Sequence, residues 1–234
     1  MLGPETAQPT PLAAPAARCA GVDVDYVLPA GEVVHALRQV DAVFPRGRLS
    51  VVAGPSGSGK SSLLRVLSGL QRPRSGRIEI GGVDLTGLRE ARRRWLRRRT
   101  MGIVLQDPAD NLVEYLRAHE QVELAARLRG VDPAETAQVL GAVGLTDRAG
   151  SYPSELSGGE QQRVAFAAAA IGPPAVLLAD EPTAELDGDA GATLVQALRR
   201  LVEEGATLIV ASHDPAVIAA ADHPVTLRDG RVVA

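Results

Sequence analysis

Lysine is almost absent from this chain: of its 25 basic residues only Lys60 is a lysine, and the other 24 are arginines. Cys19 is the single cysteine, which excludes an internal disulfide and favours a reducing compartment. Aromatic residues make up only 3% of the sequence, so we expect a core built mainly from valine, leucine, isoleucine and alanine. A net charge of −3 disfavours a protein whose main task is to coat nucleic acid.

Long apolar runs are also missing, because no stretch of about eighteen consecutive apolar residues occurs. We therefore expect no segment that spans a membrane by itself. Residues 1–19 are rich in proline and alanine but lack the basic start and long apolar stretch of a signal peptide, so we expect a disordered tail there. Residues 20–234 are expected to form one domain with a substantial core, located in the cytoplasm.

Short apolar runs alternate with helical patterns, which predicts a largely parallel sheet covered on both faces. Residues 20–52 and 77–85 alternate instead like an antiparallel sheet, and 107–156 show helices without a strand. The predicted fold is α/β, with a parallel core, an N-terminal antiparallel β-subdomain and an inserted α-helical subdomain at about 107–160. Buried strands are predicted at 49–54, 102–106, 175–180 and 207–212, and helices at 60–70, 112–129, 134–142, 157–171 and 189–204.

The lone lysine lies in the stretch GPSGSGKSS, between a predicted strand and a predicted helix. The pattern Gly-x-x-x-x-Gly-Lys-Ser in this context is typical of a phosphate-binding P-loop, whose glycines let backbone N–H groups approach a polyphosphate. Lys60 is predicted to reach the β- and γ-phosphates, and the Ser61 hydroxyl to bind Mg²⁺. An ordinary glycine turn, the alternative, does not explain a compact ammonium kept in such an arginine-rich chain. We therefore expect a P-loop NTPase core. Its predicted nucleotide-binding residues are Gly54, Pro55, Ser56, Gly57, Ser58, Gly59, Lys60, Ser61 and Ser62.

Polar residues end several predicted strands at the sheet edge where open α/β folds bind ligands. The stretch AVLLADEP ends in two carboxylates: Asp180 is predicted to hold Mg²⁺, directly or through water, and Glu181 to orient or deprotonate an attacking water. Gln106 and His213 end two other strands in the same way. Either alone would pass as a loop residue, but four polar strand ends meeting at one edge favour a functional site.

The stretch LSGGEQQR, residues 156–163, predicts a helix start that is open to an anion. Ser157 and Glu160 form an S-x-x-E capping box. Gly158 and Gly159 follow in the first turn, where glycine lowers helix stability but leaves backbone N–H groups uncovered. A helix that is merely well capped, the alternative, does not explain the two glycines.

Taken in order, these motifs resemble the nucleotide-binding subunits of ABC transporters. The resemblance covers about residue 20 to the end of the sequence and includes a D-loop, AELD, with Asp187 in the usual position. It implies an ATPase that uses ATP and Mg²⁺, with Lys60, Gln106, Glu181 and His213 in catalysis. It also implies head-to-tail dimers, in which ATP held by one P-loop is covered by the other subunit's signature residues. Those residues are Ser157, Gly158, Gly159 and Glu160, with Asp187 also assigned to the nucleotide.

The resemblance assigns further roles to single residues. Gln106 is implied to bind the metal with Ser61 and Asp180, and to link the nucleotide state to the helical region, while His213 contacts the γ-phosphate. An aromatic residue well before the P-loop stacks on adenine in this family, and Tyr26 is the only candidate. Such stacking contributes about 1–3 kcal/mol. The alternative is a Tyr26 ring packed within the β-subdomain.

Three stretches, EVVHALRQVDAVFPRGRLSVVAG, PSELSGGEQQRVA and LADEPTAELD, look most like the lipoprotein-release and macrolide-export branch. That branch implies a separately encoded transmembrane permease, export or release, and a homodimer or a heterodimer with a related ATPase on the inner face of the membrane. No nucleic-acid partner is expected. Two departures lie where partner contacts could differ: the arginine usually found near Ala168 is missing, and VEYLRAHEQVELA is an unusual start of the helical region.

Two other functions and one charged segment stay open at this point. A soluble ABC-type ATPase acting on nucleic acid or ribosomes usually carries long insertions or a second cassette, which this chain lacks. A regulatory scaffold without turnover is disfavoured by an intact Glu181 and His213. The run REARRRWLRRR, residues 89–99, fits a contact with anionic lipid, acidic permease loops or nucleic acid. We favour a solvated helix face there, with Trp95 and Leu96 packed inward.

Overall fold

The computed structural model describes residues 14–172, 174–184, 186 and 188–233. Its centre is a six-stranded sheet in the order β10-β9-β3-β8-β7-β6, in which all neighbours are parallel except β10 and β9. Every residue of β3, β7 and β8 is buried, as expected of strands that are covered on both faces. The strands are β3 (Leu49–Ala53), β6 (Met101–Val104), β7 (Val176–Asp180), β8 (Leu208–Ser212), β9 (His223–Arg228) and β10 (Arg231–Val233).

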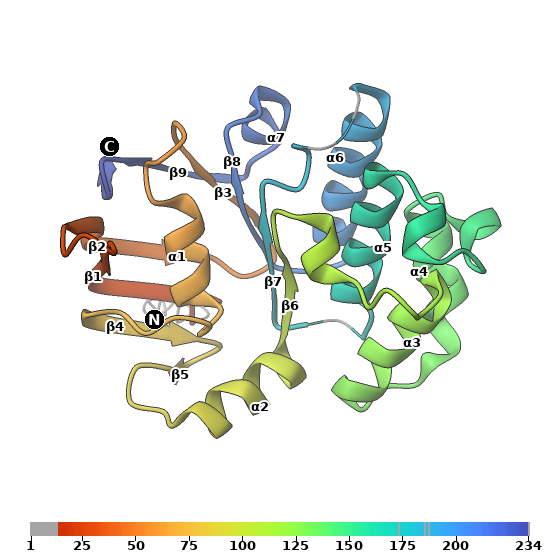
Figure 1. Ribbon diagram of the computed structural model, residues 1–234, viewed down its shortest axis with the longest axis horizontal. Helices are drawn as coiled ribbons and strands as arrows, with labels where there is room; N and C mark the ends of the chain where they lie inside the picture. The colour runs from red at the N-terminus through yellow and green to blue at the C-terminus, as the bar shows by residue number, and fades with distance from the viewer. Residues whose placement is uncertain (1–13, 173, 185, 187, 234) are drawn as a thin grey trace, which may run out of the picture.

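A second, four-stranded sheet is antiparallel throughout and has the order β2-β1-β4-β5. This is the predicted β-subdomain, and Figure 1 shows it on the opposite side of the central sheet from the helical subdomain. Its strands are β1 (Ala17–Val27), β2 (Val33–Phe44), β4 (Ser75–Ile80) and β5 (Val83–Asp84).

The prediction of a disordered tail over residues 1–19 is wrong for the C-terminal end of that segment. Residues 1–13 lie outside the described part of the chain, but β1 begins at Ala17, and both Ala17 and Cys19 are buried. Small apolar side chains at alternate positions let this segment pair with β2 and β4 and enter the core. Burial raises the pKa of the Cys19 thiol to about 12, so this cysteine is unreactive at neutral pH.

Helices cover both faces of the central sheet, and α3, α4 and α5 share a separate hydrophobic core that forms the predicted helical subdomain. The predicted helix 112–129 begins only at Ala118, because the Gln121 side chain binds the preceding backbone: it accepts from Val113 N at 3.1 Å and donates to Val113 O at 2.7 Å.

Among the described residues, no helix combines the length and apolar character needed to cross a membrane. The helices are α1 (Lys60–Leu67), α2 (Glu90–Thr100), α3 (Ala118–Arg129), α4 (Thr136–Ala142), α5 (Gly158–Ala170), α6 (Gly188–Glu203) and α7 (Pro215–Ala219), with 3₁₀ turns at Pro108–Asn111, Pro133–Glu135, Thr146–Arg148 and Pro153–Glu155.

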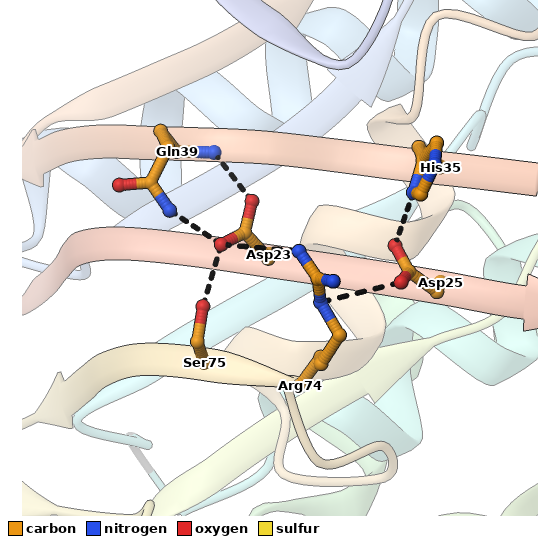
Figure 2. A network of polar contacts seen from close by, with 6 residues as sticks. All are labelled: Asp23, Asp25, His35, Gln39, Arg74 and Ser75. Carbon is orange, nitrogen blue, oxygen red and sulfur yellow. Dashed lines mark hydrogen bonds and ion pairs between the residues drawn. The ribbon is translucent and has the colours of Figure 1, made fainter.

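A buried carboxylate ties the β-subdomain together. Asp23 of β1 accepts hydrogen bonds from Gln39 N at 2.9 Å, from the Gln39 side chain, and from Ser75 Oγ at 2.5 Å, so that one residue joins β2, β1 and β4. Figure 2 shows Arg74 reaching both Asp23 and Asp25 from the start of β4. The hydrogen bonds from Ser75 and Gln39 lower the pKa of Asp23, so the network keeps its charge at neutral pH.

Arg129 joins the helical subdomain to the central sheet. From the end of α3, its guanidinium donates to Ala168 O at 3.1 Å, Ala169 O at 2.8 Å and Ile171 O at the end of α5, and to Met101 O of β6 at 3.2 Å. A helix end leaves its last carbonyl groups without intrahelical partners, and a cation there satisfies them. The end of α5, near Ala168, is thus neutralised by an arginine from another helix.

We expect Arg129→Met to lower the free energy of unfolding by about 2–4 kcal/mol, because it leaves several buried carbonyl groups without donors. Urea unfolding measures this change. Arg127→Met is the matched control in the same helix: Arg127 is exposed and forms an ion pair with Glu123, its one side-chain partner in the described part of the chain, so its loss should cost less than about 0.5 kcal/mol. Equal losses in the two variants would contradict the role of Arg129.

Candidate nucleotide and metal site

Lys60, the first residue of α1, is buried with its ammonium enclosed by oxygen atoms. Its Nζ donates to Gly54 O at 2.9 Å and Pro55 O at 3.2 Å, and lies 3.2 Å from Glu181 Oε1 at the end of β7. The loop therefore curls around the lysine, and the predicted acidic motif meets it from the next-but-one strand. These contacts bring Lys60 and Glu181 together as the sequence predicted.

The glycines of the loop press against the backbone of two other strands. A Cβ at Gly54 would lie 2.2 Å from Leu227 O of β9, and a Cβ at Gly59, where φ is 103°, would lie 2.4 Å from Ala36 O of β2. Gly57 faces open space instead. The loop is thus closed behind by β9 and β2 and open on the outer side, which is the shape of a cradle for an anionic group. On that open side Pro55, Ser56 and Gly57 are exposed, while Ser58 is buried.

Gly230, in the turn between β9 and β10, connects strands β9 and β2 to the P-loop. Its N–H donates to Ser58 O at 3.0 Å, and its own carbonyl accepts from Arg38 N of β2 at 2.8 Å. A Cβ at Gly230 would lie 2.8 Å from Ala36 O, so only glycine fits without a shift. The sequence analysis did not single out Gly230, although the DG pair between alternating apolar residues is a known hairpin signal.

Glu181 sits in an unusual backbone conformation directly after β7. Its φ is 45°, in the left-handed region that non-glycine residues seldom adopt, and its N–H is held by Ala211 O at 2.9 Å. The carboxylate lies 3.0 Å from His213 Nδ1 and accepts from His213 N at 3.3 Å. The carboxylate is buried, whereas the imidazole is largely exposed. Glu181 is therefore held between Lys60 and His213.

The three residues predicted to hold a metal line one groove. Ser61, Gln106 and Asp180 border a cavity of about 670 Å³ between the central sheet and the start of α5. Asp180 is buried, and its Oδ1 has no hydrogen-bond partner among the residues that the structure describes. Burial raises the pKa of Asp180, an effect that a hydrogen bond with Ser61 opposes and that the nearby charge of Glu181 strengthens. A buried carboxylate oxygen without a partner, beside a hydroxyl and an amide, suits Mg²⁺.

Within the described residues, no group of three or more His, Cys, Asp or Glu side chains is placed to hold a metal alone. This also fits Mg²⁺, which proteins commonly bind through one or two side-chain oxygens together with the phosphates of a substrate. The residues present are therefore suited to a metal that arrives with a nucleotide.

Asn111 positions Gln106, a role that the sequence analysis missed. Its amide side chain accepts from Leu105 N at 2.7 Å and donates to Leu105 O at 3.0 Å and Asp107 O at 2.8 Å. These bonds bind the backbone on both sides of Gln106 and shape the loop that carries it. Only a tertiary contact reveals this, because no spacing rule links an asparagine to a residue five positions earlier.

The predicted capping box is present at the start of α5. Ser157 Oγ accepts from Glu160 N at 3.2 Å, and the Glu160 carboxylate accepts from Ser157 N at 2.8 Å. Ser157, Gly158, Gly159 and Glu160 line a second hollow, of about 730 Å³, together with Leu186 and residues of α6. Gly158 also borders the first groove, with Ser61, Gln106 and Asp180, whereas Ser157, Gly159 and Glu160 line the second hollow and not the first.

Two predicted residues remain. The Tyr26 hydroxyl donates to Gln71 Oε1 at 2.8 Å and lies 3.2 Å from Ser62 Oγ, which ties the half-buried ring to the helix that follows the P-loop. This position is compatible with either an adenine contact or a packed tyrosine. Asp187 lies outside the described residues.

Comparison with known proteins identifies the arrangement. The sequence model of the family described as "ABC transporter" matches residues 37–184. The chain is 39% identical over 208 residues to the lipoprotein-releasing system ATP-binding protein LolD 1 of Rhodospirillum rubrum, covering 87% of this chain and 91% of that protein.

A longer relative and a solved structure agree with this match. The macrolide export ATP-binding/permease protein MacB of Nitrosomonas europaea is 40% identical over 205 residues, which are 86% of this chain but 31% of that protein, so the chain spans about a third of it. The ATP-binding cassette MJ0796, in a dimeric post-hydrolysis state bound to ADP and Pi, superposes with a TM-score of 0.87 at 32% identity. The superposition covers 93% of this chain and 97% of the MJ0796 chain.

We expect Gly230→Ala to weaken ATP binding about tenfold or more, because the new Cβ would displace the turn that holds Ser58. Isothermal titration with a slowly hydrolysed ATP analogue measures the dissociation constant. Gly82→Ala is the matched control: Gly82 also has a positive φ, 83°, but a Cβ there meets nothing within 4 Å. Both variants should lose about 1 kcal/mol of stability from the positive φ, Gly230→Ala should lose more because its Cβ also meets backbone, and only Gly230→Ala should lose affinity. Equal ATP affinities in the two variants would contradict the role of Gly230 in supporting the P-loop.

Asp180→Asn should stabilise the nucleotide-free protein at neutral pH. The raised pKa means that the folded state holds a proton on Asp180 more tightly than the unfolded state, so the ionised group destabilises the fold. This cost is absent below the ordinary pKa and grows as pH rises through the raised value. Thermal unfolding should therefore show a higher Tm for Asp180→Asn near pH 8 and no gain near pH 4, while Mg²⁺-dependent ATP hydrolysis is lost. Asp147→Asn, an exposed change of the same charge, should show neither effect.

Proposed function

This chain belongs to the ABC transporter family, as an ATP-binding domain, and we propose that it is the ATP-hydrolysing subunit of an export or release system. The observation that carries this proposal is the contact of Lys60, Glu181 and His213 at one sheet edge, beside the groove lined by Ser61 and Asp180. Phosphate-binding, metal-binding and water-activating groups converge there as the hydrolysis of a nucleotide requires.

Each side chain has a distinct task in this proposal. Lys60, released from part of its contact with Glu181, binds the β- and γ-phosphates. Ser61, Gln106 and Asp180 hold Mg²⁺, which when bound neutralises phosphate charge. Glu181 orients the attacking water and accepts its proton, and His213 donates a hydrogen bond to the γ-phosphate. The contact of 3.0 Å between His213 and Glu181 keeps both groups at the same end of the site.

We also propose that two subunits close head to tail around ATP. Ser157, Gly159 and Glu160 line the second hollow and not the groove of the proposed metal-binding residues, which leaves them available to cover the nucleotide of a partner. Uncapped N–H groups after Ser157 suit the γ-phosphate of that nucleotide. The dimeric state of MJ0796 with ADP and Pi supports this arrangement. Asp187 of the D-loop is proposed to contact the nucleotide, as the resemblance implies.

A separately encoded transmembrane permease is the proposed membrane partner, with the chain on the cytoplasmic face of the membrane. The permease is inferred from the likeness to LolD 1, which is an ATP-binding protein of a releasing system, and to MacB, which combines ATP-binding and permease parts in one chain. Opening and closing of the dimer would move the permease, with Gln106 sensing the nucleotide from its groove between the core and α5. Tyr26 is proposed to contact adenine.

Glu181→Gln should lower ATP turnover about 100-fold or more, because the amide cannot accept a proton from water. ATP binding should persist, and the variant should form an ATP-dependent dimer on size-exclusion chromatography. Glu204→Gln, an exposed change of the same charge, should behave as wild type. Turnover at the wild-type rate in Glu181→Gln would contradict the catalytic role, and a variant that binds ATP yet stays monomeric would contradict pairing of the isolated subunit.

A further inference from the structure

Helix α2 carries the arginine run, and only part of that run is used inside the protein. Arg93 and Leu96 are buried, and Glu90 forms ion pairs with Arg93 and Arg97. Arg97 also donates to Gly69 O at 2.7 Å, behind α1. These contacts fasten one face of α2 to the molecule and leave the opposite face to solvent.

The outer face is basic and carries the one tryptophan of the sequence. The expectation that Trp95 packs inward is wrong: 46% of it is exposed, because the inward positions are taken by Arg93 and Leu96. The Arg92 guanidinium lies over the Trp95 ring, 4.1 Å from its centroid, in a cation–π contact. Arg94 and Arg98 of α2, and Arg89 directly before the helix, are exposed and have no side-chain partner within the described part of the chain. Arg99 is also exposed but donates to Arg129 O at 2.9 Å.

The charge of α2 is opposite to that of the rest of the protein. Residues 89–99 hold seven arginines and one glutamate, a charge of +6, whereas the whole chain has −3, which leaves −9 for the remainder. An anionic surface would therefore repel most of the molecule and attract this helix. This uneven distribution of charge would both attract the protein to an anionic surface and turn α2 toward that surface.

We propose that the outer face of α2 binds anionic lipid headgroups at the membrane. This inference rests on the proposed function to the extent that the permease brings the chain to the membrane. Arginines on one face of a helix, together with a tryptophan that has a polar edge and an apolar ring, match the chemistry of a membrane interface. Neither the groove of about 670 Å³ nor the hollow of about 730 Å³ is lined by a residue of 89–99, so an extended surface suits this helix better than an inserted acidic peptide.

Trp95 supplies a direct readout, because it is the only tryptophan. Full-length protein is titrated with vesicles of phosphatidylcholine alone or of phosphatidylcholine mixed with phosphatidylglycerol, and the tryptophan emission is followed alongside co-sedimentation. The mixed vesicles should bind the protein and shift its emission to shorter wavelength, and high salt should reverse both effects. Neutral vesicles should do neither.

A triple variant, R89Q/R94Q/R98Q, should bind the mixed vesicles roughly 100-fold more weakly, since each arginine near such a surface contributes about fivefold. The matched control, R200Q/R228Q/R231Q, removes three exposed arginines outside α2 that have no side-chain partner among the described residues, and it should bind like wild type. ATP hydrolysis without vesicles should be equal in wild type and both variants. This separates the inference from the proposed function, because loss of hydrolysis in wild type would overturn only the latter.

Three results would overturn the inference. The first is no binding of wild type to mixed vesicles. The second is an equal loss of vesicle affinity in the control variant R200Q/R228Q/R231Q, which would show that binding depends on net charge alone. The third is tight, α2-dependent binding to an acidic peptide such as polyglutamate with none to vesicles, which would assign the face to a protein partner.

Discussion

The buried ammonium of Lys60 is the constraint around which the candidate site is arranged. Only 6% of this residue is exposed, and a charge so enclosed must be paired with oxygen atoms. Gly54 O and Pro55 O supply two of them, which requires the loop to turn back upon its own lysine. Glu181 supplies the third from a different strand. A guanidinium has a wider, planar head and would not fit this space, which explains the one lysine in an arginine-rich chain.

The register of the parallel strands makes that contact possible. Ala53 of β3 pairs with Ser212 of β8, and Ala211 pairs with Asp180 of β7, so three strands end at nearly the same level. The residues that follow them, the P-loop, His213 and Glu181, therefore meet at one edge. A shift of one strand by a single residue would turn each of its side chains to the opposite face and separate the three groups.

Local patterns predicted much of this arrangement. The alternation of apolar runs and helical segments indicated both sheets, and the capping box of Ser157 and Glu160 was confirmed because it depends only on residues three apart. The convergence of strand ends was predicted from the rule that parallel strands share a binding edge. The roles of the individual side chains stay predictions.

Features that depend on tertiary contacts could not be predicted from the sequence. Strand β9 contains Pro224, which argues against a strand inside a sheet, yet Pro224 lies opposite Val51 of β3 and outside the part of β9 that pairs with β10. The start of α3 depends on a side chain, Gln121, that binds backbone ahead of the helix. Trp95 was assigned inward because a large aromatic ring favours burial, but Arg93 and Leu96 are three residues apart and already fill the inner face.

The turn around Gly230 has a consequence for the order in which the protein is made. The phosphate loop emerges early from the ribosome, but its rear wall is formed by Leu227 and Gly230, which are translated much later. Until then the loop lacks the backbone that supports Ser58 and closes behind Gly54. A nascent chain that has not yet reached the turn at Gly230 therefore cannot assemble a complete phosphate cradle, so ATP can stabilise only molecules whose synthesis has passed this turn.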